Sequence, residues 1–409
     1  MMENVYDVLT ERGFIKQASH PEEIRDLLGK QSVTFYIGYD PTADSLHIGH
    51  YVQLMSMAHM QRFGHRPIVL LGAGTAMIAD PSGKTELRRI LSAEELDHNA
   101  ACIKKQMERL LDFSQGKAVM RNNADWLRSL NFMDFMRDIA IHFSVNRMLT
   151  AECYRQRMEQ GLTFFEMSYM LMQSYDFLML NRMDDCILQM GGDDQWSNIL
   201  AGADLIRRKE RRPAYALTTS LLTTSNGQKM GKTEKGALWL DKNKTSVFDF
   251  YQYWRNVDDA DVENCLSLLT FLPMEQIRDL CKVEGSKINE AKKVLAYTLT
   301  EQVHGTLEAE QAQAAAEALF GSGGDYSNMP KIELSSEDIE STGLRICDLL
   351  VMGKLCKSKS DARRMIESGA VFADDSKISD FAAVLDENKL KDGVILRKGK
   401  KSFVRVMAK

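Results

Sequence analysis

The sequence predicts an α/β protein built on a doubly wound parallel sheet of the Rossmann-like kind. Two runs, VTFYIGY at 33–39 and PIVLLGAGT at 67–75, are apolar and are typical of buried parallel strands. Between them HIGHYVQLMSMAHMQRFG, residues 47–64, has helical spacing and ends at a glycine. The three segments form a strand, helix and strand unit, and its ligand site is expected at the carboxyl ends of the strands.

The rest of the chain repeats this pattern once and then becomes helical. DCILQM at 185–190 is expected to form another strand, and GGDDQWSNILAGADLIRRK at 191–209 the helix that follows it. Beyond Thr245 the pattern is strand-poor, and GSGGDYSN at 321–328 is a cluster of helix and strand breakers. We expect a Rossmann-like domain, a loop with a small α-helical domain, a linker and an α+β domain, with the boundaries 1–225, 226–320, 321–342 and 343–409.

The composition is typical of a folded protein without a membrane span. Of the 409 residues 44% are hydrophobic and 27% are charged, and no run approaches the roughly 18 uncharged apolar residues of a membrane helix. The N-terminal MMENVYDVLTERGF has early acids and no apolar segment, so a secretory signal is not expected and a cytoplasmic location is. The chain has seven cysteines, an odd number, and they are scattered with no Cys-x-x-Cys motif. This argues against a disulfide framework and against a structural zinc site.

The charge is unevenly distributed. The net charge is −5, but the last segment, 343–409, holds 15 Lys and Arg against 9 Asp and Glu. A basic module on an acidic body favours an anionic partner for the tail, such as nucleic acid.

Two histidines, His47 and His50, stand at the start of the first predicted helix. They could be metal ligands, but no third ligand of the usual type lies nearby in the sequence. They could instead belong to a helix N-terminus that faces an anion, with Gly49 letting a ligand approach the backbone and Ser45 as the cap. Two partly buried helix histidines would be the purely structural interpretation.

Two further segments contain lysines beside a glycine. ADPSGKTELRR at 79–89 is similar to a Walker A loop, but Ile78 stands where the first glycine is needed and Pro81 would interrupt the amide cradle. Its Lys84 and Arg88 could contact phosphates or RNA, or lie in a solvated loop. QKMGKTE at 228–234 could close two lysines over a polyphosphate, or could be an ordinary surface loop.

Taken together, HIGH and KMGKT resemble the paired HIGH and KMSKS signature of the class I aminoacyl-tRNA synthetases. The flanking PTADSLHIGH, DPSGK, YMLMQSYD and GGDDQW narrow the resemblance, over the whole chain, to the bacterial tyrosyl-tRNA synthetases. The tail LVMGKLCKSKSDARRMIESGAVFADD at 350–375 resembles an S4-type RNA-binding fold, which is the tRNA-binding domain of that family.

The resemblance implies an ATP-dependent tyrosine–tRNA ligase. The tyrosine carboxylate would attack the α-phosphorus of ATP and release pyrophosphate, and the tyrosyl adenylate would then pass tyrosine to the 3′ end of tRNA(Tyr). Because the attacking acid is already ionised, no general base is required, and catalysis is alignment plus charge stabilisation. The resemblance also implies Mg²⁺ accompanying ATP, no structural metal, and a homodimer.

The same resemblance assigns roles to individual residues. Tyr36 and Asp176 should bond the phenolic hydroxyl of the substrate, while His47 and His50 should donate to the phosphates. The remaining tyrosine contacts would be Asp80, Tyr169, Gln173, Gln189 and Gln195. The ATP contacts would be Asp40, Gly49, Gly192, Asp194 and Lys232, and the pyrophosphate would be covered by Lys229, Lys232 and Thr233. The tRNA contacts would be Lys84, Arg88, Arg207, Arg208, Lys357, Lys359, Arg363 and Arg364.

Two positions, Gly231 and Ile37, depart from the family pattern, and a third, Gln53, has no assigned role. Gly231 replaces the serine of KMSKS and is expected to loosen the loop, Ile37 offers the ribose no polar group, and Gln53 lies near the ATP site without an assigned role. Other functions fit less well. An RNA-binding protein that had lost its activity should have altered HIGH or KMGKT motifs or an altered pair Tyr36 and Asp176, and these are intact. A P-loop NTPase needs a glycine at 78, which is absent. A tryptophanyl enzyme should lack the pair Tyr36 and Asp176.

Overall fold

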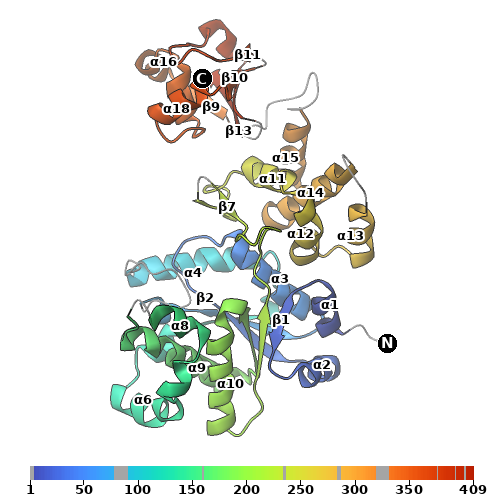
Figure 1. Cartoon of the computed structure of the whole chain (residues 1–409), viewed down its shortest axis with the longest axis vertical. Coiled ribbons are helices and arrows are strands. Elements are labelled where there is room, and N and C mark those ends of the chain that lie inside the picture. The colour runs from blue at the N-terminus through green and yellow to red at the C-terminus, as the bar shows by residue number, and fades with distance from the viewer. Residues whose placement is uncertain are drawn as a thin grey trace. The chain divides into compact units, whose positions relative to one another are not determined.

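The structure, a computed structural model, describes residues 4–77, 91–158, 161–233, 236–282, 287–318, 331–374, 376–391, 393–399 and 402–409. The chain divides into two compact units (Figure 1). One consists of Met1–Asp241 with Asp258–Gly285, and the other of Lys242–Val257 with Ser286–Lys409.

A six-stranded sheet forms the centre of the first unit. Its strands are β1 (Ile15–Ala18), β2 (Thr34–Tyr39), β3 (Arg66–Leu71), β4 (Val119–Asn122), β5 (Leu188–Gly192) and β6 (Tyr215–Thr219). They follow the order β1-β6-β5-β2-β3-β4, and all neighbours are parallel except β1 and β6. The predicted doubly wound sheet is confirmed. The strand order reverses between β2 and β5, which is where such a sheet opens its ligand crevice.

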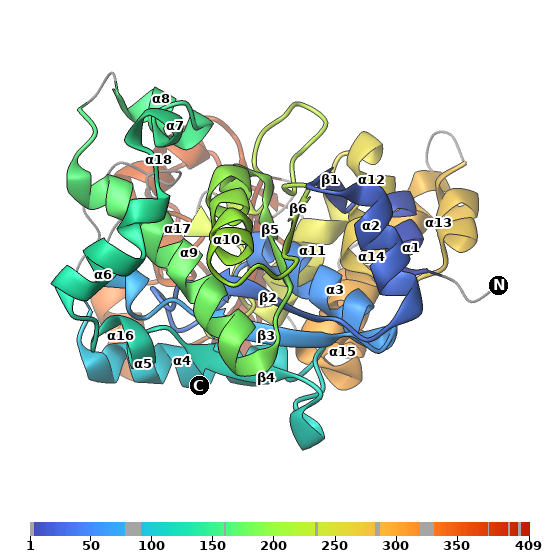
Figure 2. The same ribbon diagram turned by 90° about the horizontal axis from the view of Figure 1, so that it is seen from below.

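Helices cover both faces of this sheet (Figure 2). Successive side chains of β2 point to opposite faces of the sheet, so both faces carry apolar groups that need cover. On one face Tyr36 packs with Phe177, and on the other the Tyr39 hydroxyl contacts Met57 Sδ of α3 at 3.6 Å. The helices of the first unit are α1 (Val5–Glu11), α2 (Pro21–Lys30), α3 (Ile48–Arg62), α4 (Ala93–Met107), α5 (Ala124–Leu127), α6 (Phe132–Asp138), α7 (Val145–Met148), α8 (Glu152–Met158), α9 (Phe164–Asp184), α10 (Trp196–Lys209), α12 (Val262–Leu269) and α13 (Met274–Cys281). Two short strands, β7 (Lys232–Thr233) and β8 (Gly236–Ala237), form a separate hairpin.

The helices α12 and α13 belong to a different unit from the one that the predicted domain boundaries gave them. We expected everything from 226 to 320 to form one loop and helical domain, but 258–285 groups with the sheet. The reason is Arg12, a buried side chain of the N-terminal region, whose Nη1 donates to the carbonyls of Ser267 and Thr270 at 3.0 and 2.9 Å. Such long-range satisfaction of helix-end carbonyls leaves no local mark in the sequence.

The second unit begins with a small helical bundle. It contains α11 (Val247–Arg255), α14 (Ile288–His304) and α15 (Thr306–Ala318), which pack on one another around Phe250 and Trp254. The buried face of α15 is made of alanines, namely Ala309, Ala312, Ala315 and Ala316. Small side chains of this kind allow a neighbouring helix to pack closely.

The C-terminal part of the second unit is an α+β fold with its own core. Its elements are β9 (Lys331–Leu334), α16 (Ser336–Thr342), α17 (Ile346–Met352), α18 (Lys359–Glu367), β10 (Val371–Ala373), β11 (Ser376–Lys377), β12 (Val394–Lys398) and β13 (Ser402–Ala408). The strand order is β11-β10-β12-β13-β9, with β9 parallel to β13 and the other pairs antiparallel.

The prediction of a linker over 321–342 is wrong for residues 331–342. These residues form β9 and α16, and Leu334 is 1% exposed in the C-terminal core. The acidic composition concealed two ordinary signals: an apolar alternation at Ile332 and Leu334, and a capping box in which Ser335 and Asp338 bond each other's backbone N–H. Separately, in the part of the chain that the structure describes, no helix is long and apolar enough to cross a membrane.

Candidate active site

A cleft of about 820 Å³ opens at the carboxyl ends of β2 and β5. It is lined by thirteen of the predicted site residues: Tyr36, Asp40, His47, Gly49, His50, Tyr169, Gln173, Asp176, Gln189, Gly192, Asp194, Gln195 and Lys229. Five other predictions are not tested, because Asp80, Lys84 and Arg88 and the side chains of Lys232 and Thr233 lie outside the described residues.

The inner end of the cleft contains an unpaired phenol and a buried carboxylate. Tyr36 is 1% exposed and Asp176 is 2% exposed, and the Tyr36 hydroxyl has no hydrogen-bond partner among the described residues. Burial, and then the nearby Asp176, raises the pKa of Tyr36 well above its ordinary value. The phenol therefore stays neutral and can donate a hydrogen bond to a ligand.

Two side chains that the sequence analysis did not identify hold the Asp176 carboxylate. Trp126 Nε1 donates to Oδ1 at 2.7 Å, and Asn123 Nδ2 donates to Oδ2 at 3.0 Å. Burial, with a smaller contribution from Asp40, raises the pKa of Asp176 to about 7 in spite of these two bonds, which lower it. Asn123 directly follows β4 at the same sheet edge, so its position was a readable signal, whereas nothing in the sequence marked Trp126.

Amide acceptors line the middle of the cleft. Gln173 Oε1 and Gln189 Oε1 are buried and have no partner within the described ranges. Gln173 stands four residues after Tyr169 on α9, so both face the cleft one helical turn apart. Buried unpaired acceptors of this kind are costly unless a ligand supplies donors, so this region is suited to a ligand with N–H groups.

The HIGH segment forms the start of α3, with His47 at its N-cap. His47 Nδ1 accepts from the Gly49 N–H at 3.1 Å, and His50 Nδ1 accepts from the His47 N–H at 3.4 Å. The expectation that Ser45 caps this helix is wrong, because the Ser45 hydroxyl instead donates to the Leu46 carbonyl at 2.8 Å. The two imidazoles stack with centroids 3.8 Å apart and planes at 18°.

This geometry fixes the chemistry of the two histidines. Burial lowers the pKa of His47, and burial together with the neighbouring His47 lowers the pKa of His50 to about 3. Both rings are therefore neutral near pH 7, and because each Nδ1 accepts a backbone proton, the ring proton is assigned to Nε2. The pair offers two neutral N–H donors beside the helix start. In the described ranges, no group of three or more His, Cys, Asp or Glu could hold a metal ion.

Two glycines, Gly49 and Gly192, lie at the end of the cleft near the start of α3 and have little room for a side chain. A Cβ on Gly49 would lie 2.9 Å from His47 Cε1, and a Cβ on Gly192 would lie 2.6 Å from Asp194 Oδ1 and 3.2 Å from Gln53 Nε2. Gln53 therefore lies beside Gly192 in the cleft. Ile37, in contrast, is 1% exposed and is absent from the described lining of the cleft, because it points to the other face of β2 from Tyr36.

The adjacent aspartates Asp193 and Asp194 face different ways. Asp194 lines the cleft, whereas Asp193 Oδ1 accepts from Gln17 Nε2 at 2.6 Å and from Thr218 Oγ1 at 2.9 Å. Gln17 and Thr218 belong to β1 and β6, so Asp193 fastens the turn after β5 to the neighbouring strands. The predicted ATP contact was Asp194 and not Asp193, and Asp194 is the one of the two that lines the cleft.

The KMGKT segment contacts the start of α3 directly. Gly231 adopts a φ of +84°, and a Cβ there would lie 2.1 Å from Ile48 Cγ2. The Leu238 N–H donates to the Gly231 carbonyl at 2.8 Å, and the Ile48 N–H donates to the Leu238 carbonyl at 3.0 Å. The glycine therefore permits a close approach between the two motifs, and the expectation that it loosens the loop is not supported by these contacts.

Comparisons with known proteins agree with this geometry. The family model "tRNA synthetases class I (W and Y)" matches residues 29–321, and "Tyrosine--tRNA ligase SYY-like C-terminal domain" matches residues 324–406. The Tyrosine--tRNA ligase of Clostridium kluyveri is 58% identical over 409 residues, which is 100% of both chains. That of Clostridium botulinum (strain Hall) is 57% identical over 408 residues, 99% of this chain and 100% of the relative.

The chain belongs to the tyrosyl-tRNA synthetase family. This is a family of class I aminoacyl-tRNA synthetases, which are ATP-dependent ligases. A crystal structure of a C-terminally truncated mitochondrial tyrosyl-tRNA synthetase from Aspergillus nidulans matches with a TM-score of 0.69 at 28% identity, covering 78% of this chain and 94% of that one.

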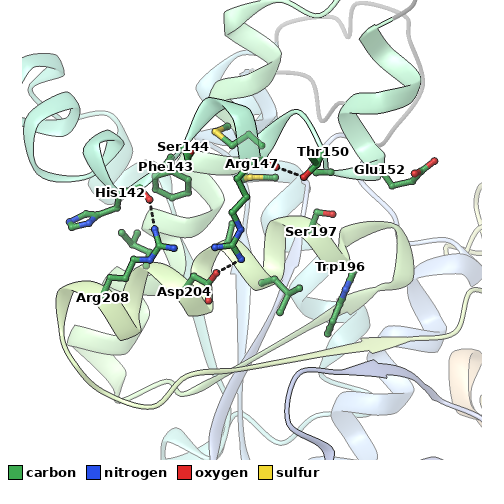
Figure 3. A pocket seen from close by; sticks show the side chains of 16 residues that line it. His142, Phe143, Ser144, Arg147, Thr150, Glu152, Trp196, Ser197, Asp204 and Arg208 are labelled. Atoms are coloured by element: carbon green, nitrogen blue, oxygen red, sulfur yellow. Dashed lines mark hydrogen bonds and ion pairs between the residues drawn. The ribbon is translucent and has the colours of Figure 1, made fainter.

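One of the two arginines predicted to contact tRNA in this synthetase domain, Arg208, lies by a second pocket, of about 320 Å³, between α7 and α10 (Figure 3). Arg208, which lines it, donates from Nη1 to the His142 carbonyl at 2.7 Å, and Arg207 donates from Nη2 to Asp204 at 2.5 Å. Asp204 also accepts from Arg147 at 2.8 Å. Arg208 thus ties α10 to the segment at His142 and remains exposed to solvent, whereas Arg207 pairs within α10 itself.

The basic residues predicted for the C-terminal domain have acidic neighbours. Lys359 Nζ lies 2.6 Å from Asp348, Arg363 bonds Glu367 at 2.9 Å, and Arg364 lies 3.5 Å from Asp361. The Arg363 guanidinium also lies 4.3 Å from the centre of the Phe381 ring. Lys357 is exposed, and its backbone N–H donates to Asp361 at 3.1 Å.

Proposed function

We propose that this protein is a cytoplasmic tyrosine–tRNA ligase that forms tyrosyl adenylate from tyrosine and ATP and transfers tyrosine to tRNA(Tyr). The observation that carries the proposal is the unpaired Tyr36 hydroxyl beside the buried Asp176. A buried pair built to bond a hydroxyl is left unsatisfied by phenylalanine, and tyrosyl-tRNA synthetases are the standard example of such rejection. Gln173 and Gln189 would accept hydrogen bonds from N–H donors of the ligand.

The nucleotide end supports a reaction without a general base. Neutral His47 and His50 would donate from Nε2 to phosphate oxygens as the tyrosine carboxylate attacks the α-phosphorus. Lys229, exposed at the rim of the cleft, would stabilise the leaving pyrophosphate. Asp194 would bond the ribose, while Gly49 and Gly192 let the nucleotide approach the backbone. Mg²⁺ is proposed to arrive with ATP, held by phosphate oxygens.

Exchange of labelled pyrophosphate into ATP, compared for tyrosine, phenylalanine and tryptophan, tests this reaction. We expect exchange with tyrosine and very little with the other two amino acids. Exchange that depends on tryptophan, or on no amino acid, would refute the proposal.

We propose that tRNA contacts both units. Arg207 and Arg208 would meet the acceptor arm, while Lys357, Lys359, Arg363 and Arg364 would meet the anticodon side. Since the C-terminal core includes β9, a clean truncation removes 331–409 rather than 343–409. The truncated protein should keep pyrophosphate exchange and lose tRNA charging. An equal loss of both activities would contradict this division, and charging by the full chain should fall steeply with salt.

We also propose a homodimer. Three large apolar side chains on α6 and the turn after it, Phe132, Met133 and Ile141, are 65%, 70% and 75% exposed, and Phe164 at the start of α9 is 64% exposed. Large apolar side chains with this much exposure mark a candidate interface, and in the proposed dimer a second copy covers them. Sedimentation velocity should give a dimer for the wild type and a monomer for Ile141→Asp. A wild-type monomer at micromolar concentration would rule the dimer out.

A further inference from the structure

A buried carboxylate outside the cleft has no part in the chemistry above. Asp261 is 3% exposed and stands at the N-cap position of α12. An N-cap aspartate usually accepts a hydrogen bond from the first turn of its own helix, which is worth about 1 kcal/mol. In α12 no such bond is made. Instead Asp261 Oδ1 accepts from the backbone N–H of Ser225 at 2.6 Å.

Ser225 lies in the turn that leads into the KMGKT segment. The Gly227 N–H donates to the Thr224 carbonyl at 2.8 Å, and the Thr224 N–H donates to the Gln228 carbonyl at 2.8 Å. Gln228 immediately precedes Lys229. By holding Ser225, Asp261 therefore fixes the turn from which Lys229 projects.

A second contact joins α12 to the same segment one helical turn further on. Cys265 Sγ lies 3.5 Å from Met230 Sδ, and the two residues are 0% and 7% exposed. Because Asp261 and Cys265 are four residues apart, they present the same side of the helix. Lys229 thus lies between two anchored neighbours, Ser225 and Met230, while its own side chain is exposed at the cleft.

The other end of α12 is fastened to the core. Besides Ser267 and Thr270, the Leu272 carbonyl accepts from the buried Arg12. The Phe271 ring, just beyond the helix, lies 3.4 Å from the Arg62 guanidinium carbon and 4.9 Å, centre to centre, from the His59 ring. Arg62 and His59 belong to α3, the helix that begins at the HIGH motif. The helix α12 thus connects the C-terminal end of α3 with the turn that precedes KMGKT.

We propose that α12 acts as a brace between α3 and the KMGKT segment, and that Asp261 is a positioning residue for Lys229. Asp261 lies outside the cleft and acts through the Ser225 turn. Holding this turn reduces the conformational freedom that Lys229 must lose before its ammonium group can meet the charge that develops on the leaving pyrophosphate. The inference rests on the proposed role of Lys229 in adenylate formation.

Single-turnover formation of tyrosyl adenylate by the full-length protein tests this role, with tyrosine affinity measured separately by equilibrium dialysis. Asp261→Ala should lower the maximal rate about tenfold and leave tyrosine binding unchanged. Asp261→Asn keeps an oxygen acceptor of the same shape and should stay within about threefold of wild type. The matched control is Asp258→Ala, because Asp258 is exposed, lies three residues earlier and makes no capping bond; its rate should be unchanged.

The decisive comparison uses Lys229→Ala as a second background. If Asp261 acts through Lys229, adding Asp261→Ala to Lys229→Ala should lower the rate of adenylate formation by less than about twofold. A tenfold loss in both backgrounds, a wild-type rate for Asp261→Ala, or a matching loss of tyrosine affinity would each overturn the proposal. If Asp261→Ala does not fold, Asp261→Glu, which moves the acceptor by one methylene, replaces it in the same cycle. Absence of tyrosine-dependent exchange in the wild type would refute the proposed function instead.

Discussion

The two ends of the cleft are built in opposite ways. At the inner end the proposed ligand groups are Tyr36 and Asp176, whose side chains are almost fully buried. Two further side chains donate hydrogen bonds to the Asp176 carboxylate. At the outer end they are two neutral imidazoles at a helix start, two glycines and an exposed lysine. In the proposed reaction the inner end rejects a wrong amino acid, because a buried polar group without a partner is costly. The outer end is proposed to stabilise charge that appears only during the reaction.

The largest effect should come from the outer end. Lys229→Ala removes a positive charge proposed to meet the leaving pyrophosphate, and we expect adenylate formation to slow by about 100- to 1,000-fold. Tyrosine affinity should not change, because the inner end is untouched. Single-turnover kinetics and equilibrium dialysis measure the two quantities, and Gln228→Ala, an exposed neighbour, is the control. A loss of tyrosine affinity of the same size would show that the two ends do not act separately.

The second effect concerns the cost of burying Asp176. The pKa of Asp176 is raised from 3.8 to about 7 in the folded state. Between pH 3.8 and pH 7 the folded state therefore holds a proton on this carboxyl, whereas the unfolded chain does not. The carboxyl therefore favours folding at low pH, and this contribution disappears as the pH rises through about 7. On going from pH 8 to pH 5, wild type should gain about 2–3 kcal/mol of unfolding free energy relative to Asp176→Asn.

Urea unfolding of both proteins at pH 5 and pH 8 measures this difference. Other titrating groups are shared by the two proteins and cancel in the comparison. A constant difference between wild type and Asp176→Asn would mean that Asp176 is ionised throughout this range, and that the inner end is more polar than its burial indicates.

The third effect separates the carboxylate from its supports. Trp126→Phe removes the donor 2.7 Å from Asp176 Oδ1 and keeps most of the ring volume. We expect kcat/KM for tyrosine to fall about tenfold and the preference over phenylalanine to narrow, with KM for ATP unchanged. Trp196→Phe, at the second pocket in Figure 3, should leave pyrophosphate exchange at the wild-type rate. Equal changes in the two variants would show that the Trp126 hydrogen bond has no special role.

The fold of the first unit was largely predictable because its strands are short apolar runs that carry their own signals. The run VTFYIGY predicted β2. The segment GGDDQ, which follows the strand predicted from DCILQM, predicted the sheet edge at which the cleft opens. The placement of α12 was not predictable, because Arg12 binds carbonyls more than 250 residues away. The strand at 331–334 was missed because charged residues obscured one buried and one partly buried apolar position in a four-residue strand.

The site divides in the same way. Residues within contiguous motifs, such as His47, Gly49 and Gly192, came together as expected. Residues that act through another side chain were missed, since Trp126 lies 50 positions from Asp176 and Asp261 lies 36 positions from Ser225. Such pairs are created by the tertiary fold, and no local periodicity or spacing encodes them. Gly231 shows the same limit, because only the structure shows Ile48 occupying the space where a Cβ would lie.

The smallest effect tests whether the outer end depends on a buried support as the inner end does. Asp193 Oδ1 accepts from Gln17 and Thr218, which fastens the turn that carries Gly192 and Asp194. Asp193→Asn keeps an acceptor oxygen and loses only the charge, so KM for ATP should rise about two- to fivefold while tyrosine affinity stays constant. Gln17→Leu should have a similar effect, since it removes the donor of the same bond. If tyrosine affinity falls instead, the strand end that carries Gln189 must move with the turn, and the two ends of the cleft share a support through β5.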